Sequence, residues 1–198
     1  MNDWNGNRRA VFVTNGDSNH SDTQRAEFDY YATDPRAVRA LLEREKFAPE
    51  ILEPACGGGH IAETLKKEHY FVECSDIVKR DYNGQNKTAD FLQQQEKWRG
   101  DIITNPPYKY AAEFVEHALQ VIEDGHKVAM FLKLTFLEGE KRRALFQQHP
   151  PRKIYVFTNR INCALNGEEK YFTKSSAVCY AWFVWVKGNK ENPVLYWI

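Results

Sequence analysis

The feature that most constrains the fold of this chain is an alternation of short apolar segments with segments of helical periodicity. Segments typical of strands lie at residues 50–52, 70–74, 101–103, 127–132, 154–157 and 176–186, and a weaker one ends near 90–91. Helical patterns begin at Asp34-Pro35, after a turn at 56–59, and at Ala111. Strands that alternate with helices predict a doubly wound α/β domain, whose mostly parallel sheet is covered on both faces.

The length of the chain and its charge balance bear on the number of domains and on the choice of partner. A length of 198 residues and a hydrophobic content of 42% suit a single domain. Residues 1–27 are polar and show little periodicity, so we expect a loosely ordered arm before one domain at 28–198. The 27 basic residues balance 27 acidic ones, so a nucleic-acid partner has to be argued from local features.

Cysteine spacing and apolar runs bear on metal binding and location. Cys56, Cys74, Cys163 and Cys179 form no C-x-x-C pair and have no His at metal-ligand spacing, so we expect no metal site and no disulfide framework. The longest apolar run, 177–186, is too short to cross a bilayer, and the polar first residues contain no signal-peptide core. We therefore expect a soluble cytoplasmic protein without a membrane partner.

A glycine-rich turn at residues 56–59 lies between a predicted strand and a predicted helix. Glycines there let the backbone approach a ligand closely. The spacing Gly57-x-Gly59-x-x-Ala62, with Asp76 about 20 residues further on, also satisfies the dinucleotide-binding fingerprint, so a nicotinamide cofactor is one alternative. An ordinary tight turn, with Asp76 as a helix cap, is another.

Acidic residues around this turn favour S-adenosylmethionine over a nicotinamide cofactor. Glu53 would repel a pyrophosphate but suits the cationic end of S-adenosylmethionine. Asp76, at the end of the second predicted strand, is placed to accept hydrogen bonds from the ribose hydroxyls. Asp90 and Phe91 could hold the edge and the face of the adenine ring. We therefore expect S-adenosylmethionine as the cofactor.

The most informative stretch is Asn105-Pro106-Pro107-Tyr108, directly after a predicted strand. Its two prolines end the strand and stiffen the loop. The amine of adenine is a poor nucleophile because its lone pair is delocalised into the ring. The Asn105 side-chain oxygen and the Pro106 carbonyl could accept from both N–H bonds and bias that nitrogen toward a tetrahedral form, while Tyr108 offers a stacking face. The alternative is a Pro-Pro loop followed by a surface tyrosine.

These motifs together resemble the gamma-ordered, NPPY-type family of DNA adenine N6-methyltransferases. Residues 28–35 (FDYYATDP) are similar to that family's N-terminal element, with Asp34 inserted before Pro35. The resemblance implies a Rossmann-like class I methyltransferase fold, with a seven-stranded sheet and a final antiparallel strand. It implies amine binding by Asn105, Pro106, Pro107 and Tyr108, and cofactor contacts from Tyr31, Thr33, Glu53, Ala55, Gly57, Gly59, Asp76, Ile77, Asp90, Phe91 and Asn105.

The motif indicates the functional group but not the polymer that carries it, because release-factor glutamine methyltransferases and some RNA adenine methyltransferases resemble this chain in their Asn-Pro-Pro-Tyr element. Three features favour DNA. First, the Tyr-x-Thr-like element lies directly before the glycine turn, without a separate helical domain. Second, residues 127–160 hold eight basic residues (Lys127, Lys133, Lys141, Arg142, Arg143, Arg152, Lys153 and Arg160) against two acids, which suits phosphate contacts; a solvated helix face explains 140–143 equally well.

The third feature is the aromatic segment at 155–160, which occupies the place where that family contacts the flipped base. Phe157 is the candidate ring, although an inward-facing core residue is the more ordinary role for it. Phe172 is an alternative, and Arg160 a candidate phosphate contact. We expect double-stranded DNA with a flipped adenine, or single-stranded DNA, as the partner.

Two function classes compete: an amino-methyltransferase, and a cofactor-binding scaffold or sensor without activity. Intact Asn105 and Tyr108 favour the enzyme. Few residues after Tyr108 lie outside predicted strands and helices, so little chain is left for reading bases in the major groove. We therefore expect a short or relaxed recognition sequence.

Overall fold

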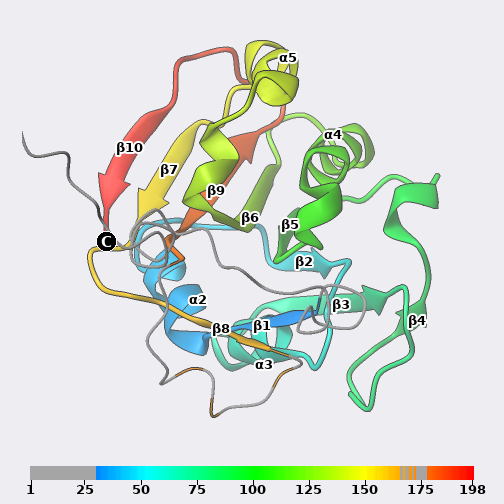
Figure 1. The fold of residues 1–198 in the computed structure, drawn as a ribbon. Helices are drawn as coiled ribbons and strands as arrows, with labels where there is room; N and C mark the ends of the chain where they lie inside the picture. The colour runs from blue at the N-terminus through cyan, green and yellow to red at the C-terminus, as the bar shows by residue number, and fades with distance from the viewer. Residues whose placement is uncertain (1–29, 166, 168–169, 171, 173–177) are drawn as a thin grey trace, which may run out of the picture.

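The computed structural model describes residues 30–165, 167, 170, 172 and 178–198. The expected N-terminal arm and the first two residues of the predicted 28–35 element lie outside these residues. A sheet of eight strands crosses Figure 1 from β10 to β4. Its strands are β2 (Glu50–Glu53), β3 (Phe71–Asp76), β4 (Lys87–Thr88), β5 (Asp101–Thr104), β6 (Lys127–Lys133), β7 (Lys153–Val156), β9 (Tyr180–Val186) and β10 (Val194–Trp197).

The strand order is β10-β7-β9-β6-β5-β2-β3-β4. Strand β9 runs antiparallel to both of its neighbours, β6 and β7, and every other pair in this sheet is parallel. The expected mostly parallel sheet with an antiparallel strand is therefore confirmed, but that strand is not the final one, because β10 follows it and is parallel to β7. Ligand-binding loops of such a sheet follow the carboxyl ends of its parallel strands.

The prediction of seven strands missed β10, which adds an eighth at the sheet edge. Its four side chains, from Val194 to Trp197, are between 39% and 70% exposed. A strand with neither face buried has no alternation of apolar and polar residues, so its sequence pattern gives no strand signal. The tyrosine of this strand, Tyr196, still stacks on Tyr155 of β7, with ring centroids 5.4 Å apart.

Within the described residues, four helices cover the sheet: α2 (Pro35–Leu42), α3 (His60–Lys67), α4 (Ala111–Val121) and α5 (Arg143–Gln148). Short 3-10 turns lie at Phe91–Gln93, Tyr108–Tyr110, Leu134–Leu137 and Glu140–Arg142. The predicted start of the first helix is confirmed, because the Asp34 carboxylate accepts a hydrogen bond from the Arg36 N–H at 2.8 Å. Proline at the next position needs no hydrogen-bond acceptor there.

The core lies on both faces of the sheet, because the inner strands carry apolar side chains that alternate between the faces. Helices α4 and α5 cover one face, where α4 packs on residues such as Ile102 and Met130. Helices α2 and α3 cover the other, around Ile103 and Trp182 (Figure 1). The Trp182 indole N–H donates to the Ala37 carbonyl at 2.8 Å, which ties α2 to the sheet.

A separate two-stranded ribbon pairs β1 (Tyr31–Thr33) with β8 (Cys163–Leu165) in antiparallel register. Thr33 faces Cys163 across this ribbon. Each strand has three residues, too few for a periodic pattern, so the sequence did not predict the ribbon. Through it, two segments far apart in the chain meet beside the loop that follows β5.

Candidate functional site

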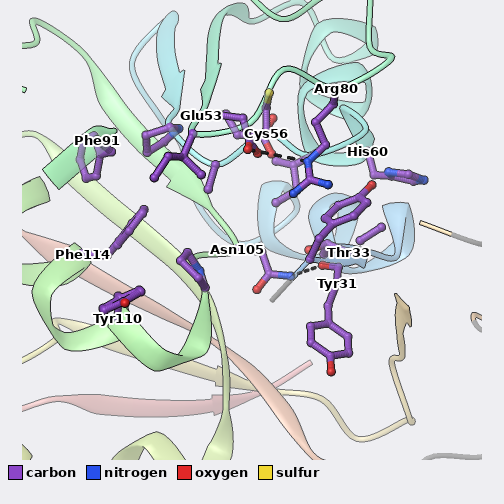
Figure 2. Close-up of a pocket in the computed structure, with 18 of the residues that line it drawn as sticks. Tyr31, Thr33, Glu53, Cys56, His60, Arg80, Phe91, Asn105, Tyr110 and Phe114 are labelled. Carbon is purple, nitrogen blue, oxygen red and sulfur yellow. Dashed lines mark hydrogen bonds and ion pairs between the residues drawn. The ribbon is translucent and has the colours of Figure 1, made fainter. Parts of the chain in front are cut away.

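A pocket of about 690 Å³ opens at the carboxyl ends of β2, β3 and β5. Figure 2 shows the side chains around it. Its wall contains ten residues that the sequence predicted: Tyr31, Thr33, Glu53, Ala55, Asp76, Ile77, Asp90, Phe91, Asn105 and Pro107. It also contains residues that the sequence did not single out, among them Tyr30, Cys56, His60, Arg80, Lys109, Tyr110 and Phe114.

The glycine-rich turn shapes this pocket without lining it. Gly57 and Gly59 have φ angles of 52° and 80°, the left-handed region that favours glycine. A Cβ added at Gly57 would lie 2.2 Å from the Tyr30 ring, and one at Gly59 would lie 2.4 Å from the Tyr82 ring. These glycines therefore make room for the protein's own aromatic rings, and their direct contact with the cofactor stays a prediction.

Asp76 ends β3 with its carboxylate buried at the pocket wall. One oxygen accepts from the Gly57 N–H at 2.8 Å, and the other from the Val78 N–H at 3.0 Å. Because each carboxylate oxygen has a second lone pair, both can still accept a hydroxyl donor from a ligand. The turn and the acid thus hold each other in place, and Ile77, 59% exposed, follows at the rim.

Glu53 and Thr33 bring unpartnered oxygen atoms to the pocket. Glu53 is 1% exposed and Thr33 is 2% exposed. Within the described part of the chain, neither Glu53 Oε2 nor Thr33 Oγ1 has a hydrogen-bond partner. Burial raises the pKa of Glu53 well above its usual value, and the nearby Cys74 and Asp76 act in the same direction. A buried acid of this kind suits a cationic ligand, because a nearby positive charge would stabilise the carboxylate in place of the water that burial removes.

One wall of the pocket is apolar and aromatic. Phe91 packs on Phe114, with ring centroids 5.2 Å apart, and on the edge of His117 at 4.9 Å. Asp90 caps the turn that carries Phe91, because its side chain accepts from the Leu92 N–H at 3.0 Å. This wall offers a flat apolar surface with a carboxylate at its edge, which fits the adenine end of a nucleoside.

Asn105 lies at the end of the pocket, one residue after β5. Its Nδ2 donates to the Tyr31 carbonyl at 2.7 Å. A carbonyl oxygen can only accept, so this bond fixes which end of the amide is the NH2 group. The Asn105 side-chain oxygen is left as an acceptor for a ligand. Figure 2 shows this bond between the labelled Asn105 and Tyr31.

Of the two prolines, Pro107 lines the pocket and Pro106 is buried outside it. Tyr108 is not part of the wall either. Its ring stacks on that of Tyr31, with centroids 5.9 Å apart and planes at 28°, and its hydroxyl lies 3.4 Å from Cys163 Sγ. Burial raises the pKa of Tyr108 well above its usual value. The structure therefore separates the predicted Asn-Pro-Pro-Tyr unit between the pocket and an aromatic cluster beside it.

The three predicted substrate contacts outside that unit lie elsewhere. Phe157 packs edge-on against Phe131, with ring centroids 6.0 Å apart, which fits the ordinary core role; its contact with a flipped base stays a prediction. Arg160 lies outside the pocket and donates to Cys179 Sγ at 3.1 Å. Phe172 is also outside the wall, but its ring meets His60 of the wall at 5.8 Å.

Most of the eight basic residues at 127–160 make contacts within the protein. Lys127 and Lys153 begin β6 and β7, at the end of the sheet opposite the pocket, where both pair with the buried Glu45. Arg152 pairs with Glu191 at 3.0 Å. Arg142 donates to backbone carbonyls of the preceding turn. The local excess of charge in the sequence therefore does not form one surface.

Arg80 is the most informative residue that the sequence analysis missed. Its guanidinium lies 4.4 Å from the Tyr30 ring centroid and 3.7 Å from an Asp76 oxygen. Its Nε atom is buried without a hydrogen-bond partner among the described residues. The one signal for it was its position four residues after Asp76. A half-buried cation at the wall suits a carboxylate on a ligand.

Metal binding and membrane insertion find no support in the described residues. No group of three or more His, Cys, Asp or Glu side chains in residues 30–165 and 178–198 could hold a metal ion. In the same part of the chain, no helix combines the length and the apolar character needed to cross a membrane.

Comparison with known proteins shows the fold. No protein-family model matches the sequence, and no curated protein does. Among solved structures, a protein of Listeria monocytogenes described as a class I S-adenosylmethionine-dependent methyltransferase is 14% identical, with a TM-score of 0.60 over 96% of this chain and 71% of that one. The type IIG restriction endonuclease BpuSI is 15% identical (TM-score 0.58, 92% of this chain and 28% of that one). The M protein of the type I restriction enzyme EcoKI is also 15% identical (TM-score 0.55, 96% and 51%). The chain therefore has the class I methyltransferase fold.

Proposed function

We propose that this protein is an S-adenosylmethionine-dependent methyltransferase whose acceptor is the exocyclic amine of adenine in DNA. The observation that carries the proposal is the Asn105 amide at the end of the pocket, turned by the Tyr31 carbonyl so that its oxygen faces a ligand. An oriented acceptor after a proline-stiffened strand end, beside a nucleoside-sized pocket, is what transfer to an amine requires.

The pocket residues fit S-adenosylmethionine at each of its parts. The orphaned Glu53 oxygen would face the positively charged methionine end, where Arg80 could bind the carboxylate. Asp76 would accept from the ribose hydroxyls, and the wall of Phe91 and Phe114 would pack on the adenine. When bound, the cofactor supplies an electrophilic methyl group on its sulfonium.

The same residues disfavour the nicotinamide alternative. A pyrophosphate at the glycine turn would meet the buried Glu53 carboxylate rather than a cradle of free N–H groups. The Gly57 N–H, which such a phosphate would use, already donates to Asp76. The glycine spacing that satisfies the fingerprint here serves Tyr30 and Tyr82 instead.

Asn105 and the Pro106 carbonyl provide the chemistry on the acceptor side. They accept hydrogen bonds from the two N–H bonds of the amine, which localises the nitrogen lone pair and points it at the methyl group. The new N–C bond forms as the C–S bond breaks, and the nitrogen then releases one proton to water. No strong base at the nitrogen is required, because the proton leaves after the nitrogen has become cationic.

The choice of DNA rests on the resemblance of the motif order and on two of the structural neighbours. BpuSI and the EcoKI M protein belong to restriction enzymes, and this chain spans 28% and 51% of them. The other acceptors for an Asn-Pro-Pro-Tyr loop are RNA adenine and protein glutamine. Because few described residues lie outside the sheet and its helices, we also propose a short or degenerate recognition sequence.

The experiment is methyl transfer from labelled S-adenosylmethionine to three acceptors: single- and double-stranded DNA, RNA of the same sequence, and a glutamine-containing release-factor peptide. We expect transfer to DNA that falls steeply with salt, because phosphate contacts release counterions. Consumption of cofactor with RNA or the peptide alone would replace the DNA assignment. Cofactor binding without transfer to any acceptor would favour the scaffold or sensor.

A further inference from the structure

The ring of Tyr108 is half-buried and packs among several neighbouring side chains. Tyr31 stacks on it at 5.9 Å, and Tyr180 lies against it at 6.2 Å. The Lys133 ammonium lies 5.0 Å from the ring centroid, and Cys163 Sγ meets the hydroxyl. An acceptor base that stacks on the part of the ring covered by Tyr31 or Tyr180 must therefore displace that neighbour. The binding of an acceptor base at Tyr108 rests on the proposed function.

Two of the neighbours are poor candidates for displacement. Tyr180 is 8% exposed, belongs to the antiparallel strand in the middle of the sheet, and stacks on Phe131 at 5.0 Å with planes 15° apart. Cys163 touches the edge of the ring through its sulfur and does not cover a face. Lys133 is a flexible cation that can move aside, but it is not flat and does not fill the space of a base.

Tyr31 is the planar neighbour that can leave. Its side chain is half-buried, and its strand has three residues paired on one side only, with β8. Figure 2 shows its ring on the far side of Asn105 from Glu53 and Phe91, directed away from the cofactor pocket. The backbone carbonyl that orients Asn105 belongs to the same residue. The side chain can therefore rotate while the carbonyl stays on the amide.

We propose that the Tyr31 ring occupies the place of the acceptor base on Tyr108 and rotates out when the base enters. Tyr31 then has two separate roles: its carbonyl positions Asn105, and its ring competes with the acceptor. The same ring keeps the apolar face of Tyr108 covered when no acceptor is bound. Because an exposed aromatic face would stack on any base, this competition weakens stacking of every base, so that binding depends more on the contacts with Asn105.

The test compares Tyr31→Ala with Tyr31→Phe, which keeps the ring. The probe is fluorescein-labelled single-stranded oligo(dA), bound in the presence of S-adenosylhomocysteine and followed by fluorescence anisotropy. Removing the competing ring should make the alanine variant bind oligo(dA) about two- to twelve-fold more tightly than the phenylalanine variant, the range expected for one aromatic pair. An abasic oligomer of the same length should bind both variants equally, because it has phosphates but no base.

Equal or weaker oligo(dA) binding by the alanine variant would overturn the proposal, as would an equal gain on the abasic oligomer or an absence of base-dependent binding. Tyr31→Leu, apolar but not flat, decides the matter if the alanine variant does not fold, and it should show the same gain. Methyl transfer is measured in parallel on the wild type. A gain in base binding without transfer would retain the role of Tyr31 and reject the proposed function; transfer without a gain would do the reverse.

Discussion

The two halves of the site differ in how ready they are for a ligand. The cofactor half is an open pocket of about 690 Å³ with unpartnered oxygen atoms on Glu53 and Thr33. The acceptor half, around Tyr108, is filled by the protein's own aromatic rings. Asn105 stands at the boundary and lines the pocket. A preformed pocket fits a cofactor that is always the same molecule, whereas a closed acceptor half admits only a partner that can displace the cover.

The largest effect on turnover is expected from a substitution of Asn105, at the boundary between the two halves. Asn105→Ala removes the oriented acceptor and should lower turnover by about two to three orders of magnitude, as for other single positioned hydrogen-bonding groups. Affinity for S-adenosylmethionine, measured by calorimetry, should change little. The matched control is Asn83→Ala, at an exposed asparagine outside the pocket. Turnover within a few-fold of the wild type would show that the two halves do not meet at Asn105.

The next effect tests the cofactor half alone. Asp76→Ala should weaken S-adenosylmethionine binding about ten-fold or more, because a charge-assisted hydrogen bond contributes about 1.5 to 3 kcal/mol. The variant also leaves the Gly57 and Val78 N–H groups without their acceptor. Asp81→Ala, which removes the same charge at an exposed position, is the control for calorimetry. Unchanged affinity in the Asp76 variant would show that Asp76 only caps the turn and does not bind the cofactor.

The pH dependence of cofactor binding sharpens the role of Glu53. Burial raises the pKa of Glu53, so part of the free protein carries a neutral acid that cannot attract a cation. Affinity for S-adenosylmethionine should therefore rise as the pH increases from the usual range of a glutamate pKa through the raised pKa of Glu53, by at most about ten-fold per pH unit. In Glu53→Gln this rise should vanish. If the affinity of the wild type does not change with pH over the same range, Glu53 does not interact with the cationic end of the cofactor.

The smallest effect is expected at the Tyr108 hydroxyl. It contacts a thiol at 3.4 Å and no group of the pocket wall, so Tyr108→Phe should retain activity within about three-fold. Tyr108→Ala should lose about 1 to 3 kcal/mol of base stacking, seen as a higher KM for DNA. Thermal unfolding of both variants controls for the packing of this ring in the core. An inactive phenylalanine variant would mean that the hydroxyl takes part in the reaction.

Much of the cofactor half could be predicted from the sequence, because its signals are local. A strand, a glycine turn and an acid at the next strand end follow one another within residues 50–76, and a parallel sheet brings such loops to one edge. The roles of Gly57 and Gly59 were predicted less well. Their close neighbours, Tyr30 and Tyr82, come from other parts of the chain, and no local pattern indicates which rings will need that space.

The acceptor half was harder to predict because it depends on contacts between distant segments. The β1–β8 ribbon brings Tyr31 and Cys163 to the Asn105 loop, although each strand is only three residues long. Phe157 appeared in a suitable place along the chain, but it lies one residue after β7 and packs against Phe131 of the core. Lys127 and Lys153 added to a basic count, yet they neutralise a buried acid at the other end of the sheet.

The central claim is that a methyl group reaches an amine held at Asn105. The most direct measurement is mass spectrometry of nucleosides from DNA incubated with the protein and S-adenosylmethionine, compared with DNA incubated with Asn105→Ala. We expect N6-methyladenine as the methylated nucleoside, in short or degenerate contexts, and its near absence with the variant. Methylation of a ring carbon, or equal N6-methyladenine from both proteins, would contradict the account.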